Sequence, residues 1–255
     1  MIIPKRIKRS VDFSVTIIIW MYFTLGYFIL FSPFYFFSFL FSHNREKSFQ
    51  KLNHRFFKSF FWVVRIITPR LHIHIDDDVY SIRSSVIVCN HISYLDPILL
   101  ISLFDQQKTI IKKTFLKVPV FGWLLKTSGY LFTSTEDTFT TFLSEGVENL
   151  KNYLLSGGNI FIFPEGTRSR DGKIGRLNKG AFSLAKRYRA PIEVLMIKNT
   201  NTLFAPEKFL FNTCIPNTIE VKRILSLQPE YTSGTFSMHT PIEQARQAFE
   251  QQREP

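Results

Sequence analysis

The chain has 255 residues, enough to bury the core of one large domain, and it contains no internal repeat and no linker-like stretch. Its 32 Lys and Arg residues against 20 Asp and Glu give a formal charge of +12, which favours anionic partners such as phospholipid head groups, phosphate-bearing cofactors, acidic proteins or nucleic acid. Cys89 and Cys214 lack metal-ligand spacing, so neither a zinc site nor a disulfide framework is indicated, and a reducing, cytoplasm-facing domain is expected.

Residues 13–42 form an uncharged, apolar and aromatic stretch that follows the basic residues 5–9 and predicts a membrane segment. A cleaved signal peptide is the alternative, but its apolar region is typically about 7–15 residues long. As one helix the stretch is about 45 Å long, more than the ~30 Å hydrocarbon core needs, and Pro33 is expected to break it.

Basic residues flank this stretch on both sides, and the positive-inside rule places both flanks in the cytoplasm. We therefore expect a helical hairpin or re-entrant structure that turns near Ser32-Pro33 and dips into the cytoplasmic leaflet. This divides the chain into a membrane-associated helical region, 1–68, and an α/β domain, 69–255.

Residues 44–68 place a set of apolar side chains on one broad helical face. Burial against lipid and burial against protein give the same pattern, so a helix lying along the membrane and a core-facing helix both stay open. The apolar set is Phe49, Leu52, Phe56, Phe57, Phe60, Phe61 and Val64.

From residue 71 onward, short strand patterns alternate with helical patterns, which predicts an α/β fold with a mostly parallel central sheet covered by helices. In such sheets, functional sites gather beyond the carboxyl ends of the strands. The expected strands are 71–75, 86–89, 109–111, 130–133, 159–163, 192–197 and 219–227, and the expected helices are 97–104, 120–126, 136–155, 179–188 and 241–253.

One polar segment, Asn90 to Asp96, directly follows the strand predicted at 86–89. A carboxylate that accepts a hydrogen bond from one imidazole nitrogen fixes the tautomer, leaving the other nitrogen to take a hydroxyl proton. His91 and Asp96 are therefore candidates for activating a substrate hydroxyl. The structural alternative is that Asp96 and Ser93 only cap the helix that begins near Pro97.

A second polar segment, Phe163 to Arg170, follows the strand predicted at 159–163. The turn Glu165-Gly166-Thr167 exposes backbone N–H groups, and Arg168 carries a rigid, permanently charged fork suited to phosphate. A solvated basic loop explains the charges equally well but not the Phe-Pro-Glu-Gly at its entrance.

Together the two segments resemble the lysophospholipid (glycerolipid) acyltransferase family over roughly residues 70–200, through a His-x-x-x-x-Asp element and the Phe163–Arg168 block. The resemblance is closest to lysophosphatidic acid acyltransferases. It implies transfer of a fatty acyl group from acyl-CoA or acyl carrier protein to a lysophospholipid hydroxyl, with no bound cofactor or metal. It also implies that His91 is the general base, that Asp96 orients it, and that Glu165, Gly166, Thr167 and Arg168 bind the acceptor.

The sequence departs from the family pattern at two places. Thr135 stands where the family usually carries an arginine that holds the acceptor phosphate, so Lys112, Lys113, Arg168 or Lys179 is expected to supply this contact. The family's second proline after Pro191 is also missing, because the chain reads Ile192-Glu193-Val194-Leu195. Acceptors other than lysophosphatidic acid therefore stay open.

The expected partners are membrane phospholipids, a lysophospholipid acceptor and acyl carrier protein as one of two donors, at the cytoplasmic membrane with the catalytic domain facing the cytoplasm. A catalytically silent recruitment protein is the rival from another class, although it would have no need of both His91 and Asp96. Nucleic-acid binding fits the charge but lacks a motif, and acylation of a glycolipid is disfavoured by the Glu165–Arg168 block.

Overall fold

The computed structural model describes residues 4–133, 147–169 and 174–252. The chain folds into two compact units, each assembled from separate segments. The first unit consists of residues 1–75, 92–105 and 197–221, and the second consists of residues 76–91, 106–196 and 222–255. The functional division proposed at residues 68/69 stays a prediction.

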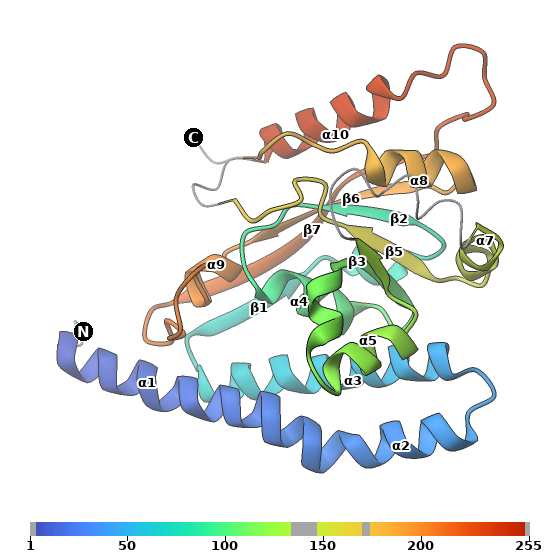
Figure 1. Cartoon of the computed structure of the whole chain (residues 1–255). Coiled ribbons are helices and arrows are strands. Elements are labelled where there is room, and N and C mark those ends of the chain that lie inside the picture. Colours follow the sequence, from blue (N-terminus) through green and yellow to red (C-terminus); the bar gives the residue numbers. More distant parts are fainter. Residues whose placement is uncertain (1–3, 134–146, 170–173, 253–255) are drawn as a thin grey trace. The chain divides into compact units, whose positions relative to one another are not determined.

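In the first unit, the N-terminal helical run consists of α1 (Lys5–Met21), the π-helical stretch η1 (Tyr22–Phe31) and α2 (Ser32–Phe41). Figure 1 shows this run in blue, followed by α3 (Arg45–Ile67), which returns alongside it. By length and composition the run Lys5–Phe41 is apolar enough to cross a membrane, a test that signal sequences and core helices also pass. Its outward face carries exposed apolar side chains, which include Phe13, Ile18, Leu25, Phe28, Ile29, Phe34, Phe37 and Phe41.

The predicted turn near Ser32-Pro33 is wrong, because the helical run continues through these residues and the chain reverses after Phe41, before α3. Pro33 lies in the first turn of α2, where a missing N–H costs little. The hydroxyl of Ser32 donates to the carbonyl oxygen of Phe28 and supplies a donor beside the proline. The change from π to α register at this point therefore accommodates Pro33 without ending the run.

The apolar face of α3 packs against protein within the first unit. Phe49, Phe56 and Phe60 are each at most 3% exposed, and the Phe23 ring of η1 meets Phe60 edge to face at 5.7 Å. Two hydrogen bonds fix the pairing: the Tyr35 hydroxyl donates to Asn53 Oδ1 at 2.6 Å, and the Tyr22 hydroxyl donates to Ser59 Oγ at 2.7 Å. Of the two alternatives, the core-facing helix is the one that the structure contains.

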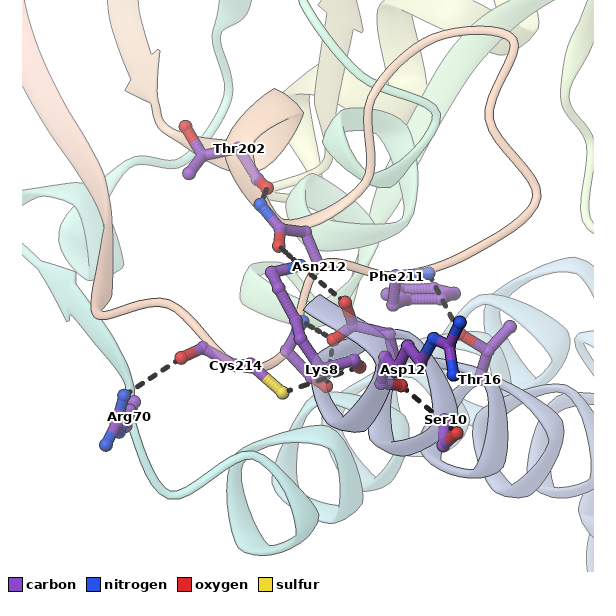
Figure 2. Close-up of polar contacts among 11 residues, drawn as sticks. Lys8, Ser10, Asp12, Thr16, Arg70, Thr202, Phe211, Asn212 and Cys214 are labelled. Carbon is purple, nitrogen blue, oxygen red and sulfur yellow. Dashed lines mark hydrogen bonds and ion pairs between the residues drawn. The ribbon is translucent and has the colours of Figure 1, made fainter. Parts of the chain in front are cut away.

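A buried polar network ties α1 to the segment that follows α9 (Thr200–Leu203), as Figure 2 shows. Lys8 Nζ donates to Asp12 Oδ2 at 2.5 Å and to Asn212 Oδ1 at 2.7 Å. Asp12 Oδ1 accepts from the backbone N–H and the hydroxyl of Thr213, both at 2.8 Å. Because Asp12 is only 5% exposed, these donors replace the water that it would lose on burial.

The remaining elements of the first unit are β1 (Leu71–Ile75), α4 (Leu95–Leu103) and the first part of β7 (Asn217–Leu227). β1 and β7 pair in parallel, with Leu71 opposite Asn217 and Ile75 opposite Val221. α4 packs against α3.

Among the described residues of the second unit, parallel strands follow one another in the order β6-β2-β5-β3-β4. β2 is an inner strand, paired with β6 along one edge and with β5 along the other, and its four residues are fully buried. The strands are β2 (Val86–Cys89), β3 (Gln107–Lys112), β4 (Leu131–Thr133), β5 (Asn159–Ile162) and β6 (Ile192–Lys198), whose last two residues belong to the first unit.

Helices of the second unit cover one face of these strands. Figure 1 shows α8 (Gly180–Tyr188) and α10 (His239–Gln251) lying over β2, β5 and β6, and α7 (Val147–Leu155) adds Leu150 and Leu154 to the same core. Phe182 of α8 and Phe249 of α10 are fully buried in it. The other short elements are η2 (Asp77–Ser81), η3 (Lys113–Lys117) and α5 (Phe121–Thr127).

The predicted α/β class with a mostly parallel sheet is confirmed. The strands expected at 71–75 and 86–89 have the predicted bounds, and most other elements begin and end within two residues of expectation. Of the helix expected at 136–155, only α7 falls on described residues, and Thr135 lies outside them.

Candidate active site

His91 lies at the carboxyl edge of the parallel strands, two residues after the end of β2. Its ring is half-buried and stacks on the ring of Phe163, which follows β5, with centroids 4.3 Å apart and planes 23° apart. Because β2 and β5 are parallel neighbours, their carboxyl ends meet at this edge. The sheet therefore places the histidine directly beside the second polar segment.

Glu165 holds the backbone of His91 in place. The N–H of His91 donates to Glu165 Oε1 at 3.2 Å, and the N–H of Gly175 donates to Glu165 Oε2 at 2.9 Å. The carbonyl oxygen of His91 accepts from the N–H of Ser169 at 2.8 Å. Both backbone groups of His91 are thus bonded to the segment that follows β5.

The turn after Phe163 depends on glycine. Gly166 has φ +71°, a conformation that a side chain disfavours, and its N–H donates to the carbonyl oxygen of Phe163 at 3.1 Å. Gly166 and Thr167 are exposed, whereas Arg168 is half-buried. The turn therefore presents Thr167 outward and keeps Arg168 close to the protein surface.

Asp96 belongs to the first unit, five residues along the chain from His91, which ends a segment of the second unit. Its carboxylate is fully buried. Oδ2 accepts from the backbone N–H groups of Ile92 and Ser93, both at 2.7 Å, and Oδ1 accepts from the hydroxyl of Thr200 at 2.5 Å. α4 begins at Leu95, so Asp96 lies inside its first turn and does not cap a helix that begins at Pro97; its carboxylate instead holds two N–H groups that precede the helix. Its catalytic role as the orienting partner of His91 stays a prediction.

Three lysines predicted for the acceptor phosphate lie in the second unit, all of them exposed. Lys112 ends β3 and Lys113 begins η3, at the carboxyl end of a strand that pairs with β5. Lys179 directly precedes α8, and its neighbour Asn178 donates its backbone N–H to the carbonyl oxygen of Pro164 at 2.8 Å. Lys112 and Lys113 are thus connected to the candidate site through β3, and Lys179 is connected to it through the bond between Asn178 and Pro164.

Several parts of the site carried little sequence signal. The N–H groups of Ser169 and Gly175 are main-chain donors that any residue except proline offers. The hydroxyl of Thr200 lies more than one hundred residues from Asp96 in the sequence. Phe163 could have been recognised as a ring partner, because it ends the strand predicted at 159–163 and begins the second polar segment.

Comparison with known proteins shows the family to which the chain belongs. The family model described as Acyltransferase matches residues 70–198. The 1-acyl-sn-glycerol-3-phosphate acyltransferase of Saccharomyces cerevisiae is 36% identical over 132 residues, which cover 50% of this chain and 43% of that protein. The chloroplastic 1-acyl-sn-glycerol-3-phosphate acyltransferase BAT2 of Brassica napus is 32% identical over 118 residues, which cover 46% of this chain and 34% of that protein. The matched part thus spans less than half the length of either relative.

Among solved structures, the crystal structure of the 1-acyl-sn-glycerophosphate (LPA) acyltransferase PlsC from Thermotoga maritima superposes with a TM-score of 0.69. It is 20% identical, and the match covers 96% of this chain and 98% of that one, which shows a shared fold. The family model covers just over half of the chain, from the residue before β1 to the end of β6. This protein therefore belongs to the acyltransferase family.

Proposed function

We propose that this protein is a membrane-bound O-acyltransferase that moves a fatty acyl group from acyl-CoA or acyl carrier protein to the free hydroxyl of a lysophospholipid. Lysophosphatidic acid, giving phosphatidic acid, is the acceptor that fits best, because the names of the relatives specify 1-acyl-sn-glycerol-3-phosphate. The observation that carries the proposal is the contact between His91 and the Phe163–Glu165 turn.

In the proposed reaction, His91 takes the proton of the acceptor hydroxyl while the oxygen attacks the thioester carbonyl carbon. The tetrahedral intermediate collapses as the C–S bond breaks, and the proton leaves with the thiol. An ester and a free thiol result, so no covalent enzyme intermediate is needed. The stacking of His91 on Phe163 and the two bonds to its backbone support this role, since a general base must hold one position.

Charge at the same edge of the strands supports an acceptor that carries phosphate. Arg168 offers a planar fork for two phosphate oxygens, and Lys112, Lys113 and Lys179 add point charges. Glu165 enters this proposal differently from the expectation drawn from the sequence, because its two oxygens accept from His91 and Gly175. We assign it to positioning His91, while Gly166 and Thr167 stay candidates for acceptor contact.

The apolar outward face of the helical run Lys5–Phe41 supports a location at the membrane, where acceptor and product both reside. We propose that it rests in the cytoplasmic leaflet, with the catalytic residues on the cytoplasmic side. The formal charge of +12 fits both an anionic membrane surface and an acidic carrier protein.

The test is an assay of the purified protein in phospholipid vesicles with a panel of lysophospholipids, each offered with acyl-CoA and with acyl carrier protein. Mass spectrometry of the lipid products reads the acceptor and the donor at once. Phosphatidic acid formation that requires His91 would support the proposal. A protein that binds the vesicles and acylates none of the acceptors would favour the recruitment role instead.

A further inference from the structure

A second exposed apolar surface lies in the second unit, on residues 113–123, which are called the apolar loop below. This segment follows β3 and consists of η3, residues 118–120 and the first three residues of α5. Apart from the buried Gly122, all of its residues are exposed. Its exposed apolar side chains are Phe115, Leu116, Val118, Val120, Phe121 and Trp123, each between 38% and 47% accessible.

The apolar loop is held in one conformation by its own backbone. The N–H of Val118 donates to the carbonyl oxygen of Phe115 at 3.2 Å, and the N–H of Gly122 donates to that of Val118 at 2.8 Å. A side chain at Gly122 would place its Cβ 2.3 Å from the carbonyl oxygen of Leu116, so only glycine allows this close approach. The loop is therefore built to present apolar side chains outward.

The backbone of Val120 is a second sign that the apolar loop has a fixed conformation. Its φ of +63° is an outlier for a β-branched residue. Such strain persists only where the surrounding structure fixes it. Here it turns the chain into α5 and leaves the Val120 side chain 47% exposed.

Lysines surround these side chains. Lys112 precedes the apolar loop, Lys113 and Lys117 lie within it, and Lys126 follows in α5; all four are exposed. Asp and Glu do not occur between residues 106 and 135. Exposed aromatic side chains among lysines are the pattern of a protein surface that enters the interface of an anionic bilayer, where each cation adds about 1 kcal/mol of attraction.

The apolar loop also lies at the edge where the candidate site is. β2, β5 and β3 are parallel neighbours, so His91, Phe163 and the start of the loop all follow carboxyl ends at one edge of the strands. A membrane contact here brings lipid to the end of the unit that carries His91.

We infer that the apolar loop of residues 113–123 is a second membrane contact, which inserts its apolar side chains into the interface of an anionic phospholipid bilayer. This contact is separate from the N-terminal helices, because the second unit alone carries it. Its purpose rests on the proposed function: it would hold Lys112, Lys113 and His91 at the depth of an acceptor head group.

The test uses tryptophan fluorescence. The chain has three tryptophans, so Trp20→Phe and Trp62→Phe leave Trp123 as the only one. Vesicles of phosphatidylcholine and phosphatidylglycerol with brominated acyl chains should quench Trp123 and shift its emission to the blue. A matched control adds Trp123→Phe and Tyr80→Trp, moving the probe to an exposed position before β2, where little quenching is expected.

Quenching of Trp123 to the same extent as the probe at position 80, in protein that co-sediments with the vesicles, would overturn the inference. A blue shift that needs no vesicles and grows with protein concentration would overturn it as well, because it would assign the surface to self-association.

A second variant, Phe115→Ser with Lys117→Glu, distinguishes membrane binding by the apolar loop from acyl transfer itself. It should lower quenching of Trp123 and weaken binding to anionic vesicles by about fivefold or more, the effect of roughly 1 kcal/mol per basic residue. Acylation of an acceptor in the bilayer should fall, while acylation of a short-chain, water-soluble acceptor should persist. If the unaltered protein acylates neither acceptor, the proposed function fails, while the quenching result still decides the membrane contact.

Discussion

The backbone N–H of His91 donates to Oε1 of Glu165 at 3.2 Å, and the other oxygen of this carboxylate accepts from Gly175. One side chain therefore joins the loop after β2 to two parts of the segment after β5. This relationship makes the candidate base depend on a residue from another strand.

Glu165→Ala should lower kcat more than it raises KM, because the loss frees the backbone of His91 without removing an acceptor contact. Misplacement of the base by about 1 Å can cost up to about a hundredfold. Glu165→Gln is the matched control: its amide oxygen can still accept from His91, so steady-state kinetics should give an intermediate kcat. An increase confined to KM in both variants would instead return Glu165 to the acceptor site.

His91→Ala should reduce acyl transfer by about 100- to 10,000-fold, the contribution of a positioned general base. Binding to vesicles and the melting temperature should change little, since the ring is only half-buried. His72→Ala, at an exposed position on β1, serves as the control for losing a histidine. The assignment fails if the two variants turn over at comparable rates.

Arg168→Ala should raise KM for a phosphate-bearing acceptor by about tenfold or more, the loss of a charge-assisted hydrogen bond. Monoacylglycerol, which lacks the phosphate, should show a much smaller change. Arg168→Lys keeps the charge but not the planar fork, so its KM should lie between that of the unaltered protein and that of Arg168→Ala. Equal effects on both acceptors would remove Arg168 from phosphate recognition.

Thr200→Val should destabilise the first unit, because it deletes a donor to the buried carboxylate of Asp96 and leaves a similar volume. The expected loss is about 1–3 kcal/mol, which corresponds to a melting temperature lower by several degrees. Thr202→Val, nearby on α9 and only half-buried, should cost less. Calorimetry that finds both variants equally stable would contradict the structural role of this bond.

Glu193 gives a prediction about pH. Burial in β6 raises the pKa of this carboxyl, while the hydrogen bond from Ser226 and the charge of Arg223 offset part of the rise. A raised folded-state pKa means that the folded state binds the proton more tightly, so stability is lost as the pH rises from the unfolded value through the folded one. The variant Glu193→Gln lacks this titration. Relative to the unaltered protein, its melting temperature should therefore increase as the pH rises above the ordinary pKa of a glutamate, and a constant difference would refute the shift.

The sequence predicted the strands well because burial on both faces leaves short, continuous apolar runs such as Val86–Cys89. It also placed His91 and the Phe163–Arg168 segment after two strands, which the structure shows to be parallel neighbours. The predicted turn at Pro33 was wrong, because the change from π-helix to α-helix that accommodates the proline leaves no pattern in the sequence. The sequence could not predict how His91 is held, because the partners of its backbone include the main-chain N–H of Ser169, which carries no residue-specific pattern.

The hydrogen bonds between α1 and residues 211–213 limit how far the chain can be shortened from its N-terminal side. Removing the N-terminal helices would strip the partners from the backbone N–H groups of Phe211 and Thr213 and uncover the aromatic side of α3. A shortened chain would therefore lose one exposed apolar surface and gain another. Polar replacements confined to outward positions such as Phe13, Phe34 and Phe41 would reduce the exposed apolar surface and leave Asp12, Thr16 and the inward rings untouched.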